Sequence, residues 1–338
     1  MVKFLVLALA GACGAAHAQT PATNPMPDGS RDMYVGLGAQ YAPRYEGARD
    51  RRTTALPMLQ IEWSNGIFIS GTSIGMHLSG SPSVEYGPLL ALAPGRDASG
   101  TRMLRLGTVG DGAGDPGGPT TSLPAPVDGF PPATSQPGTD DGFSPDTSVP
   151  GPVDEVPPGD TAEGVSDSGV GGEGIEADNT INRLEGMHHM KRRVLYGGFA
   201  NFYLTPRIRL ATNALYGAGN GRNGLRVHVA LQHLQQDIAA HHALALSAGL
   251  TLVNRAYNMA YFGVSREEAE SYWINPEYHP DGGIADVRVG ARWNWALSPA
   301  WMLTSGLQLS RLMGDAKKSP LVERPTNVSL STALVYRF

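Results

Sequence analysis

Residues 286–297, with the sequence DVRVGARWNWAL, alternate between apolar and polar or small side chains at every position. One set consists of Val287, Val289, Ala291, Trp293, Trp295 and Leu297, and the other of Asp286, Arg288, Gly290, Arg292 and Asn294. A β-strand points successive side chains to opposite faces, so this segment predicts a strand with one apolar face and one charged face. Such a strand fits either a soluble sandwich or a barrel whose apolar face meets lipid.

The same two-residue period recurs along the chain. Turn residues such as SNG, TPR and SPA separate eleven predicted strands: 33–41, 54–63, 66–78, 84–93, 193–204, 207–216, 225–233, 243–252, 286–297, 300–311 and 327–338. Single-chain bacterial barrels have even strand numbers. We therefore expect an all-β antiparallel barrel of about twelve strands, with ten as the alternative. Either a further strand lies near 99–108 or 184–192, or one early strand is false.

The first residues, MVKFLVLALAGACGAAHAQT, have the layout of a secretory signal peptide. Lys3 is followed by an apolar run over 4–12 and by a small-x-small site that ends at Ala18. We expect cleavage after residue 18, followed by a linker over 19–31. The only cysteine, Cys13, lies inside this segment, so the mature chain is expected to contain neither disulfides nor thiolate metal sites.

Two features favour a lipid-facing barrel over a soluble sandwich. The polar faces carry many charges, which a hydrated barrel interior accommodates as an ion-paired network. The candidates for lining this interior are Arg207, Arg209, Arg226, His228, Asp286, Arg288 and Arg292. Aromatic side chains near strand ends are typical of the girdles at the membrane interfaces. The girdle candidates are Trp293, Trp295, Trp301, Tyr336 and Phe338.

A segment of different composition interrupts the barrel pattern. Residues 106–182 contain fourteen acidic residues and no lysine or arginine, and they are rich in proline and glycine. This composition predicts a disordered insertion between a first barrel part, 32–105, and a second, 183–338. Outside the insertion the chain has 26 basic and 17 acidic residues, a net charge near +9. That charge suits acidic partners such as lipopolysaccharide phosphates.

Several stretches, in this order, resemble the MltA-interacting protein (MipA/OmpV) family of outer-membrane proteins. They are YVGLGAQYAPRYEGARDRR at 34–52, YGPLLALAPGRD at 86–97, LEGMHHMKRRVLYGGFANFY at 184–203, YFGVSREEAE at 261–270, SRLMGDAKKSPLVE at 310–323 and the closing YRF. The resemblance implies a barrel in the outer membrane that links a lytic transglycosylase to a penicillin-binding protein. It also implies the alternative of a surface antigen or adhesin. GMHHMKRRV departs from the family by replacing an acid with basic residues.

No catalytic, cofactor or metal motif stands out. His279 shares a loop with Ser265, but no nucleophile motif surrounds that serine. Adjacent histidines such as His188 and His189 point to opposite faces of a strand and do not chelate one metal together. We therefore expect a non-enzymatic interaction protein without cofactor, in contact with outer-membrane lipid and lipopolysaccharide and with no nucleic-acid partner. A narrow small-solute conduit is the remaining alternative, although barrels of ten to twelve strands usually have filled interiors.

Overall fold

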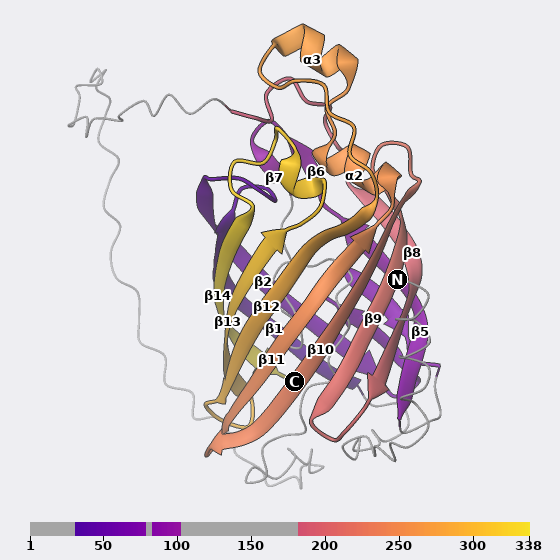
Figure 1. Cartoon of the computed structure of the whole chain (residues 1–338). Helices are drawn as coiled ribbons and strands as arrows, with labels where there is room; N and C mark the ends of the chain where they lie inside the picture. The colour runs from indigo at the N-terminus through magenta and orange to yellow at the C-terminus, as the bar shows by residue number, and fades with distance from the viewer. Residues whose placement is uncertain (1–30, 79–82, 103–181) are drawn as a thin grey trace, which may run out of the picture. The chain divides into compact units, whose positions relative to one another are not determined.

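The computed structural model describes residues 31–78, 83–102 and 182–338. Twelve strands form a closed antiparallel barrel, in which β1 pairs with both β2 and β14 (Figure 1). The predicted all-β barrel of about twelve strands is therefore confirmed. The strands are β1 (Arg31–Pro43), β2 (Arg51–Trp63), β3 (Ile67–Ser70), β4 (Ser73–Met76), β5 (Val84–Ala93), β8 (Arg193–Tyr203), β9 (Ile208–Ala218), β10 (Gly224–Ala239), β11 (His242–Val253), β12 (Gly283–Ala296), β13 (Trp301–Leu312) and β14 (Thr326–Arg337).

The twelfth strand arises where the sequence predicted one long strand. Residues 66–78 form the short hairpin β3–β4, whose turn contains Gly71 at φ 55°. Glycine adopts this left-handed conformation without a steric penalty. The places expected for a further barrel strand were wrong. Of 99–108, the structure describes only 99–102, where β7 (Gly100–Arg102) pairs with β6 (Gly95–Asp97) in a separate two-stranded sheet. Residues 184–192 are not a strand.

The two ends of the barrel differ in the length of their connections. An even strand number places the start of β1 and the finish of β14 at one end, together with tight connections such as 204–207 and 240–241. We call this the turn end, and the opposite end the loop end. The long connections 254–282 and 313–325 lie at the loop end, as do the residues that flank the insertion. The predicted signal peptide, most of the linker and nearly all of the insertion lie outside the described residues.

The barrel wall has apolar side chains outside and polar side chains inside. Leu37, Leu307 and Leu330 are 66%, 52% and 54% exposed on the outer face. Inward positions on the same barrel hold buried polar groups such as Gln40 and Asn213. This is the reverse of a water-soluble protein, and lipid is the solvent that makes it stable. Within the described ranges, no helix is both long enough and apolar enough to cross a membrane.

Two short helices and one 3-10 turn lie in the long connections at the loop end. They are α2 (Arg255–Phe262), α3 (Arg266–Tyr272) and η2 (Ala316–Lys318). Asn254 caps α2, because its side chain accepts a hydrogen bond from the backbone N–H of Tyr257. Ser265 and Glu268 form a capping box at the start of α3. In Figure 1, α3 projects farthest from the barrel.

Candidate functional site

The barrel interior holds a charged pair on β12. Asp286, which is 3% exposed, accepts two hydrogen bonds from Arg288, with Nε–Oδ1 at 2.6 Å and Nη2–Oδ2 at 3.1 Å. The same guanidinium lies 3.4 Å from a carboxylate oxygen of Glu46 in the loop-end connection 44–50. Asp286 and Arg288 are two residues apart on a strand and therefore share its inner face. Through Glu46, the pair connects the barrel wall to the loop-end connection 44–50.

Other interior candidates lie on β9, β10 and β12. Arg209 is 1% exposed and donates to Oε1 of Gln232 at 3.1 Å, and Nδ1 of His228 lies 3.3 Å from the hydroxyl of Thr251. Arg226 and Arg292 are also buried. That these side chains serve the function of the protein stays a prediction.

Arg207 is a correction to the predicted interior set. It lies in the exposed turn between β8 and β9. The predicted strand began at residue 207, but β9 begins at Ile208, after a turn in which Thr205 accepts hydrogen bonds from backbone N–H groups. Arg207 therefore points away from the interior that Arg209 lines.

A second interior cluster, near the turn end, was missed by sequence reasoning. Glu85 on β5 accepts hydrogen bonds from the side chains of Asn201 and Tyr203, each at 2.9 Å. Nδ1 of His77 lies 2.6 Å from the other carboxylate oxygen of Glu85. The signal available in the sequence was an acid on the inner face of an otherwise apolar strand. His77 follows β4 directly and was assigned to no cluster, because the hairpin that positions it was not predicted.

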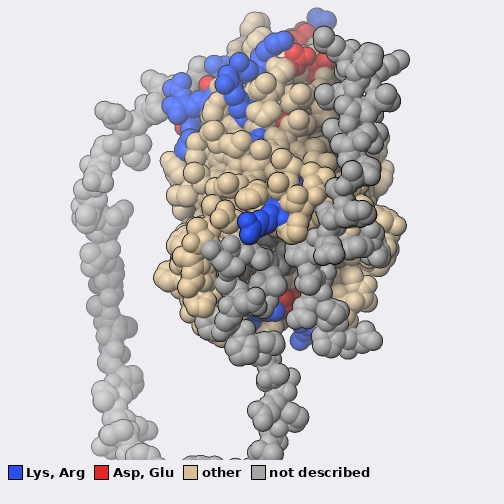
Figure 2. Space-filling model, turned by 60° about the horizontal axis from the view of Figure 1, so that its bottom comes forward, with Lys and Arg blue, Asp and Glu red and all other residues tan. Residues whose placement is uncertain are grey.

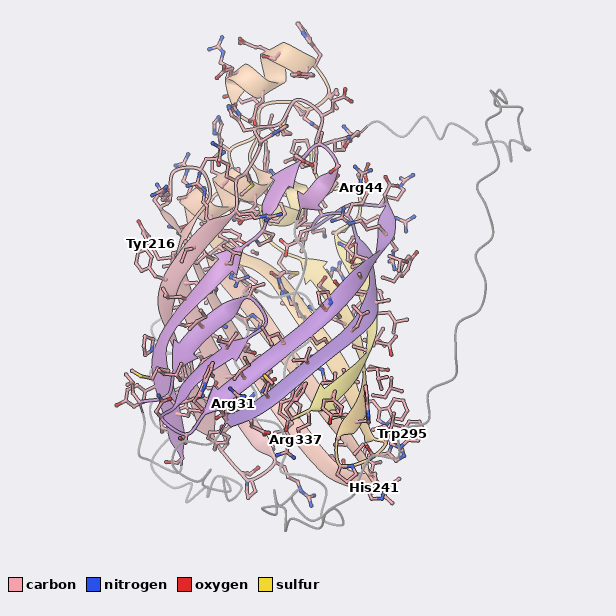
Figure 3. The ribbon with its side chains drawn as sticks, turned by 180° about the vertical axis from the view of Figure 1, so that it is seen from behind. Arg31, Arg44, Tyr216, His241, Trp295 and Arg337 are labelled. Atoms are coloured by element: carbon pink, nitrogen blue, oxygen red, sulfur yellow. The ribbon has the colours of Figure 1, made fainter. Side chains whose placement is uncertain are left out.

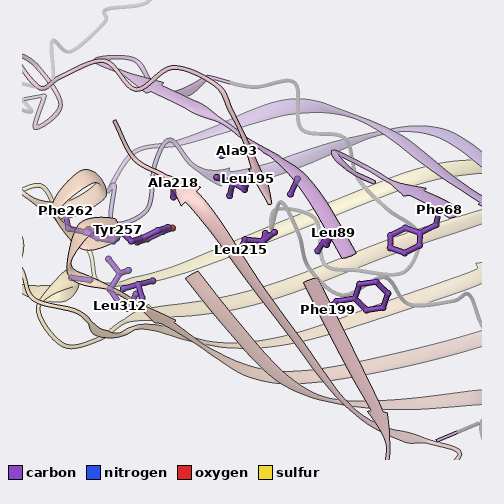
Figure 4. Close-up of a cluster of buried hydrophobic side chains, with 14 residues drawn as sticks. Phe68, Leu89, Ala93, Leu195, Phe199, Leu215, Ala218, Tyr257, Phe262 and Leu312 are labelled. Atoms are coloured by element: carbon purple, nitrogen blue, oxygen red, sulfur yellow. The ribbon is translucent and has the colours of Figure 1, made fainter. Parts of the chain in front are cut away.

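Apolar side chains fill much of the rest of the interior. Phe68, Leu89 and Phe199 belong to one buried cluster on the nearby strands β3, β5 and β8 (Figure 4), and the rings of Phe68 and Phe199 meet edge to face at 5.6 Å. Toward the loop end the same cluster continues to Tyr257 and Phe262 of α2. These contacts tie α2 to the inner wall.

The loop-end connections pack on one another and form a cap. Tyr45, Leu184, Val264 and Leu321 come from four separate connections and share one buried cluster, together with Ala48 and Met187. The hydroxyl of Tyr45 donates to the carbonyl of Leu321 at 3.1 Å. Burial of these groups at about 25 cal/mol per Å² of apolar surface holds the connections in place.

One acid ties two parts of this cap together. Glu268 accepts hydrogen bonds from the backbone N–H groups of His188 and Ser265, both at 2.8 Å, and its Oε1 lies 2.9 Å from Nδ1 of His188. His188 belongs to the stretch that departs from the family pattern. Burial of Glu268 favours its neutral form, but these hydrogen bonds favour the carboxylate more strongly. The pKa of Glu268 therefore lies below its ordinary value.

Acid is expected to loosen the contact between α3 and residues 182–192. Because the folded-state pKa of Glu268 is lowered, its stabilising contribution is complete above its ordinary pKa of about 4.5 and is lost as the pH falls below it. Hydrogen exchange of α3 amides should therefore accelerate below that pH. Glu268→Gln should exchange faster at neutral pH and show less acid response. Equal pH dependence in the variant and the parent would contradict this role.

The girdle candidates lie on the outer face at the turn end. Trp293, Trp295 and Trp301 are 37%, 38% and 44% exposed, and Figure 3 shows Trp295 near that end. His242 stacks on Trp293 and Trp295 and accepts a hydrogen bond from the indole N–H of Trp293 at 3.1 Å. Tyr336 contacts both Trp301 and Phe338 edge to face.

Sequence reasoning overlooked a second aromatic row at the loop end. Tyr196 and Tyr216 meet edge to face at 5.6 Å on the outer face, and Tyr41 is 45% exposed there. Figure 3 places Tyr216 at the end opposite Trp295. Aromatic rows at both ends of the apolar wall are what the two membrane interfaces favour. A membrane-anchoring role for these residues stays a prediction.

The comparison with family models shows which protein family the chain belongs to. The model described as "MltA-interacting protein MipA" matches residues 35–338, which cover the whole barrel and its loop cap except the first strand residues. The chain belongs to this family. It is an outer-membrane β-barrel protein.

Relatives and solved structures are distant. "Outer membrane protein Omp26La" from Vibrio anguillarum is 26% identical over 168 residues, 49% of this chain and 63% of that protein. The chain thus spans less than two thirds of that relative's length. The N-terminal barrel of Pseudomonas aeruginosa OprF is 13% identical, covering 43% of this chain and 87% of that one with a TM-score of 0.20. An outer membrane channel from Pseudomonas putida F1 is 7% identical, covering 94% and 99% with a TM-score of 0.37.

The geometry around the loop histidines gives no catalytic arrangement among the described residues. Ser265 is occupied as the cap of α3, and His279 lies 2.7 Å from Glu277 in an exposed contact. Within the same residues, no group of three histidine, cysteine, aspartate or glutamate side chains is arranged to hold a metal ion.

Proposed function

We propose that this protein is a non-enzymatic scaffold of the outer membrane that binds a murein-degrading transglycosylase and, through it or beside it, a penicillin-binding protein. The observation that carries the proposal is the family match over residues 35–338, since the family is named for interaction with MltA.

The orientation of the barrel decides which surface meets murein enzymes. Bacterial outer-membrane barrels have short turns on the periplasmic side and long loops outside. We therefore place the turn end in the periplasm and the loop end, with the flanks of the insertion, at the cell surface. The periplasmic surface then includes the tight turns around Asn65, Thr205, His241 and Pro299 and the start of β1.

Photo-crosslinking in intact cells tests the scaffold directly. A photoreactive residue at Pro206, in an exposed turn at the turn end, should capture a lytic transglycosylase or a penicillin-binding protein. The matched control carries the same residue at Glu267, which is exposed on α3 at the loop end, and should capture neither. If photoreactive residues at Pro206, Arg31 and Pro299 all captured neither enzyme while the barrel was assembled, the scaffold proposal would be contradicted.

A cysteine pair tests the orientation separately. The only cysteine of the chain lies at residue 13, within the predicted signal peptide, so an introduced thiol is unique in the mature protein. Glu267→Cys should react with a membrane-impermeant maleimide on intact cells, whereas Pro206→Cys should react only after permeabilisation. The reverse pattern would place the loop end in the periplasm.

A second candidate function, binding at the cell surface, is favoured by one observation. Trp273 at the end of α3 is 88% exposed and adopts a left-handed backbone conformation with φ 55°. A bulky residue with positive φ is uncommon, and an exposed tryptophan is often part of a binding surface. A surface adhesin would lose binding to its ligand with Trp273→Ala, whereas the periplasmic scaffold would keep its crosslinks.

A further inference from the structure

We propose that four exposed or partly exposed arginines at the loop end, two on the outer wall and two in the adjoining connections, form a binding site for the phosphate groups of lipopolysaccharide. They are Arg49, Arg51, Arg311 and Arg324, and we call them the arginine rim. The proposal rests on the orientation given above, with the loop end at the cell surface. It adds a lipid partner to the scaffold and is independent of the murein enzymes.

Arg51 and Arg311 lie where the apolar wall stops. Arg51, the first residue of β2, places its guanidinium carbon 5.6 Å from the ring centroid of Tyr41 on the outer face. Its Nη1 also donates to the carbonyl of Val328 on β14 at 3.4 Å, across the intervening strand β1. Arg311 is exposed on β13, two residues beyond Leu309, which is 41% exposed. Both charges therefore border lipid-facing surface.

Arg49 and Arg324 join this site through contacts between two connections. The backbone N–H of Arg324 donates to the carbonyl of Gly47 at 2.9 Å, and that of Arg49 donates to a carboxylate oxygen of Glu323 at 2.8 Å. Thr326, two residues after Arg324, is the register partner of Arg311. Chain segments far apart in sequence thus bring these four residues to the same side of the barrel at the loop end.

The guanidinium groups of the rim are not paired with carboxylates in the part of the chain that the structure describes. Within residues 31–78, 83–102 and 182–338, no carboxylate forms an ion pair with any of the four guanidinium groups. Of the nearby acids, Asp50 pairs with Arg44 at 3.2 Å, and Glu323 accepts a hydrogen bond from the backbone N–H of Arg49 rather than from a rim guanidinium. Figure 2 shows lysine and arginine side chains gathered at the loop end of the face in view. Such a cluster favours an anionic ligand.

The position and chemistry of the rim select a lipid phosphate. Guanidinium groups bind phosphate through paired N–H donors, and clustered basic residues beside a membrane bind anionic headgroups. A ligand bound at the rim lies beside the apolar outer face of the barrel, which extends from there toward the turn end. The acyl chains of a lipid can pack along that face. Lipopolysaccharide combines phosphates with acyl chains and occupies the outer leaflet. The Arg51–Tyr41 contact holds one cation at headgroup depth.

Binding of purified lipopolysaccharide to the detergent-solubilised full chain tests the site. Arg311→Glu with Arg324→Glu should weaken binding roughly tenfold or more, because two cations are replaced by anions. The matched control is Arg31→Glu with Arg207→Glu, which makes the same charge change at exposed turn-end positions and should leave binding unchanged. The uncharged variant Arg311→Gln with Arg324→Gln should be intermediate. Heat-modifiable migration on a gel reports which variants have assembled.

Lipopolysaccharide stripped of its phosphates gives the second arm. The parent protein should bind the dephosphorylated lipopolysaccharide no more tightly than the charge-reversal rim variant binds intact lipopolysaccharide. The rim substitutions should not weaken binding of the dephosphorylated ligand any further. Equal loss in both charge-reversal pairs, or equal affinity with and without phosphates, would overturn the proposal. Equal binding of phosphatidylglycerol vesicles would also overturn it, by showing an unselective anion surface. Crosslinks from position 206 should persist in the rim variants, so the scaffold and this site fail separately.

Discussion

Leu307→Arg is expected to prevent the barrel from assembling in the outer membrane. Leu307 lies in the middle of β13, is 52% exposed, and has Leu330 beside it on the outer face of β14. An arginine on the lipid face costs about 2–4 kcal/mol near the middle of the bilayer. That is a large fraction of the stability of an ordinary protein domain. Heat-modifiable migration and recovery in the outer-membrane fraction measure the loss.

The neighbouring inner position supplies the matched control. Gln308 follows Leu307 on the same strand and faces the interior, in register with Gly290 and Ser329. Gln308→Arg adds the same charge to a polar surface and is expected to assemble far better. Leu307→Ala controls for loss of the side chain and should also assemble. If Leu307→Arg matched the parent protein and remained soluble without detergent, the outer face would meet water and the membrane assignment would be wrong.

The fold was largely predictable because every strand of a barrel wall has the same two-residue alternation of inward and outward side chains. Along β12 every residue from Asp286 to Trp295 alternates between interior and exterior, and polar side chains such as Asp286 and Arg292 lie inside as the alternation indicates. The split of residues 66–78 was not predictable from that rule. The turn at Gly71 lies in the polar stretch SGTS at 70–73, a turn signal that the prediction of one strand did not use. The pairing of this turn with Leu59 and Leu92 shows it directly.

The candidate site was less predictable, because it depends on contacts between distant segments. The alternation identified Arg209 as an inward residue, but not that Gln232 would be its partner. The contact of His188 with Glu268 joins residues eighty positions apart, and no local pattern encodes it. The arginine rim likewise becomes visible only when β2, β13 and the connection before β14 are placed side by side.

Asp286→Ala is expected to destabilise the assembled barrel by about 3 kcal/mol, since it removes the buried carboxylate of Arg288 and leaves the guanidinium only the half-exposed Glu46, at 3.4 Å. The side chains of Asp286 and Arg288 are 5% and 14% exposed, so water compensates the guanidinium poorly. Asp286→Asn keeps an acceptor and should cost less. Urea titration of the folded form in detergent, followed by gel migration, gives the free energy of unfolding.

Two comparisons distinguish the effect of burying the Asp286–Arg288 pair from the effect of forming an ion pair at all. Arg266 and Glu270 on α3 form an ion pair at 2.7 Å, close to the 2.6 Å of the interior pair, but they are 79% and 65% exposed. Glu270→Ala should therefore cost roughly 0.5 kcal/mol or less. Adding Arg288→Leu to Asp286→Ala should recover part of the loss, because the buried charge that has lost its main partner is then removed. Strictly additive losses, or equal costs for Asp286→Ala and Glu270→Ala, would show that the interior is hydrated enough to screen the charge.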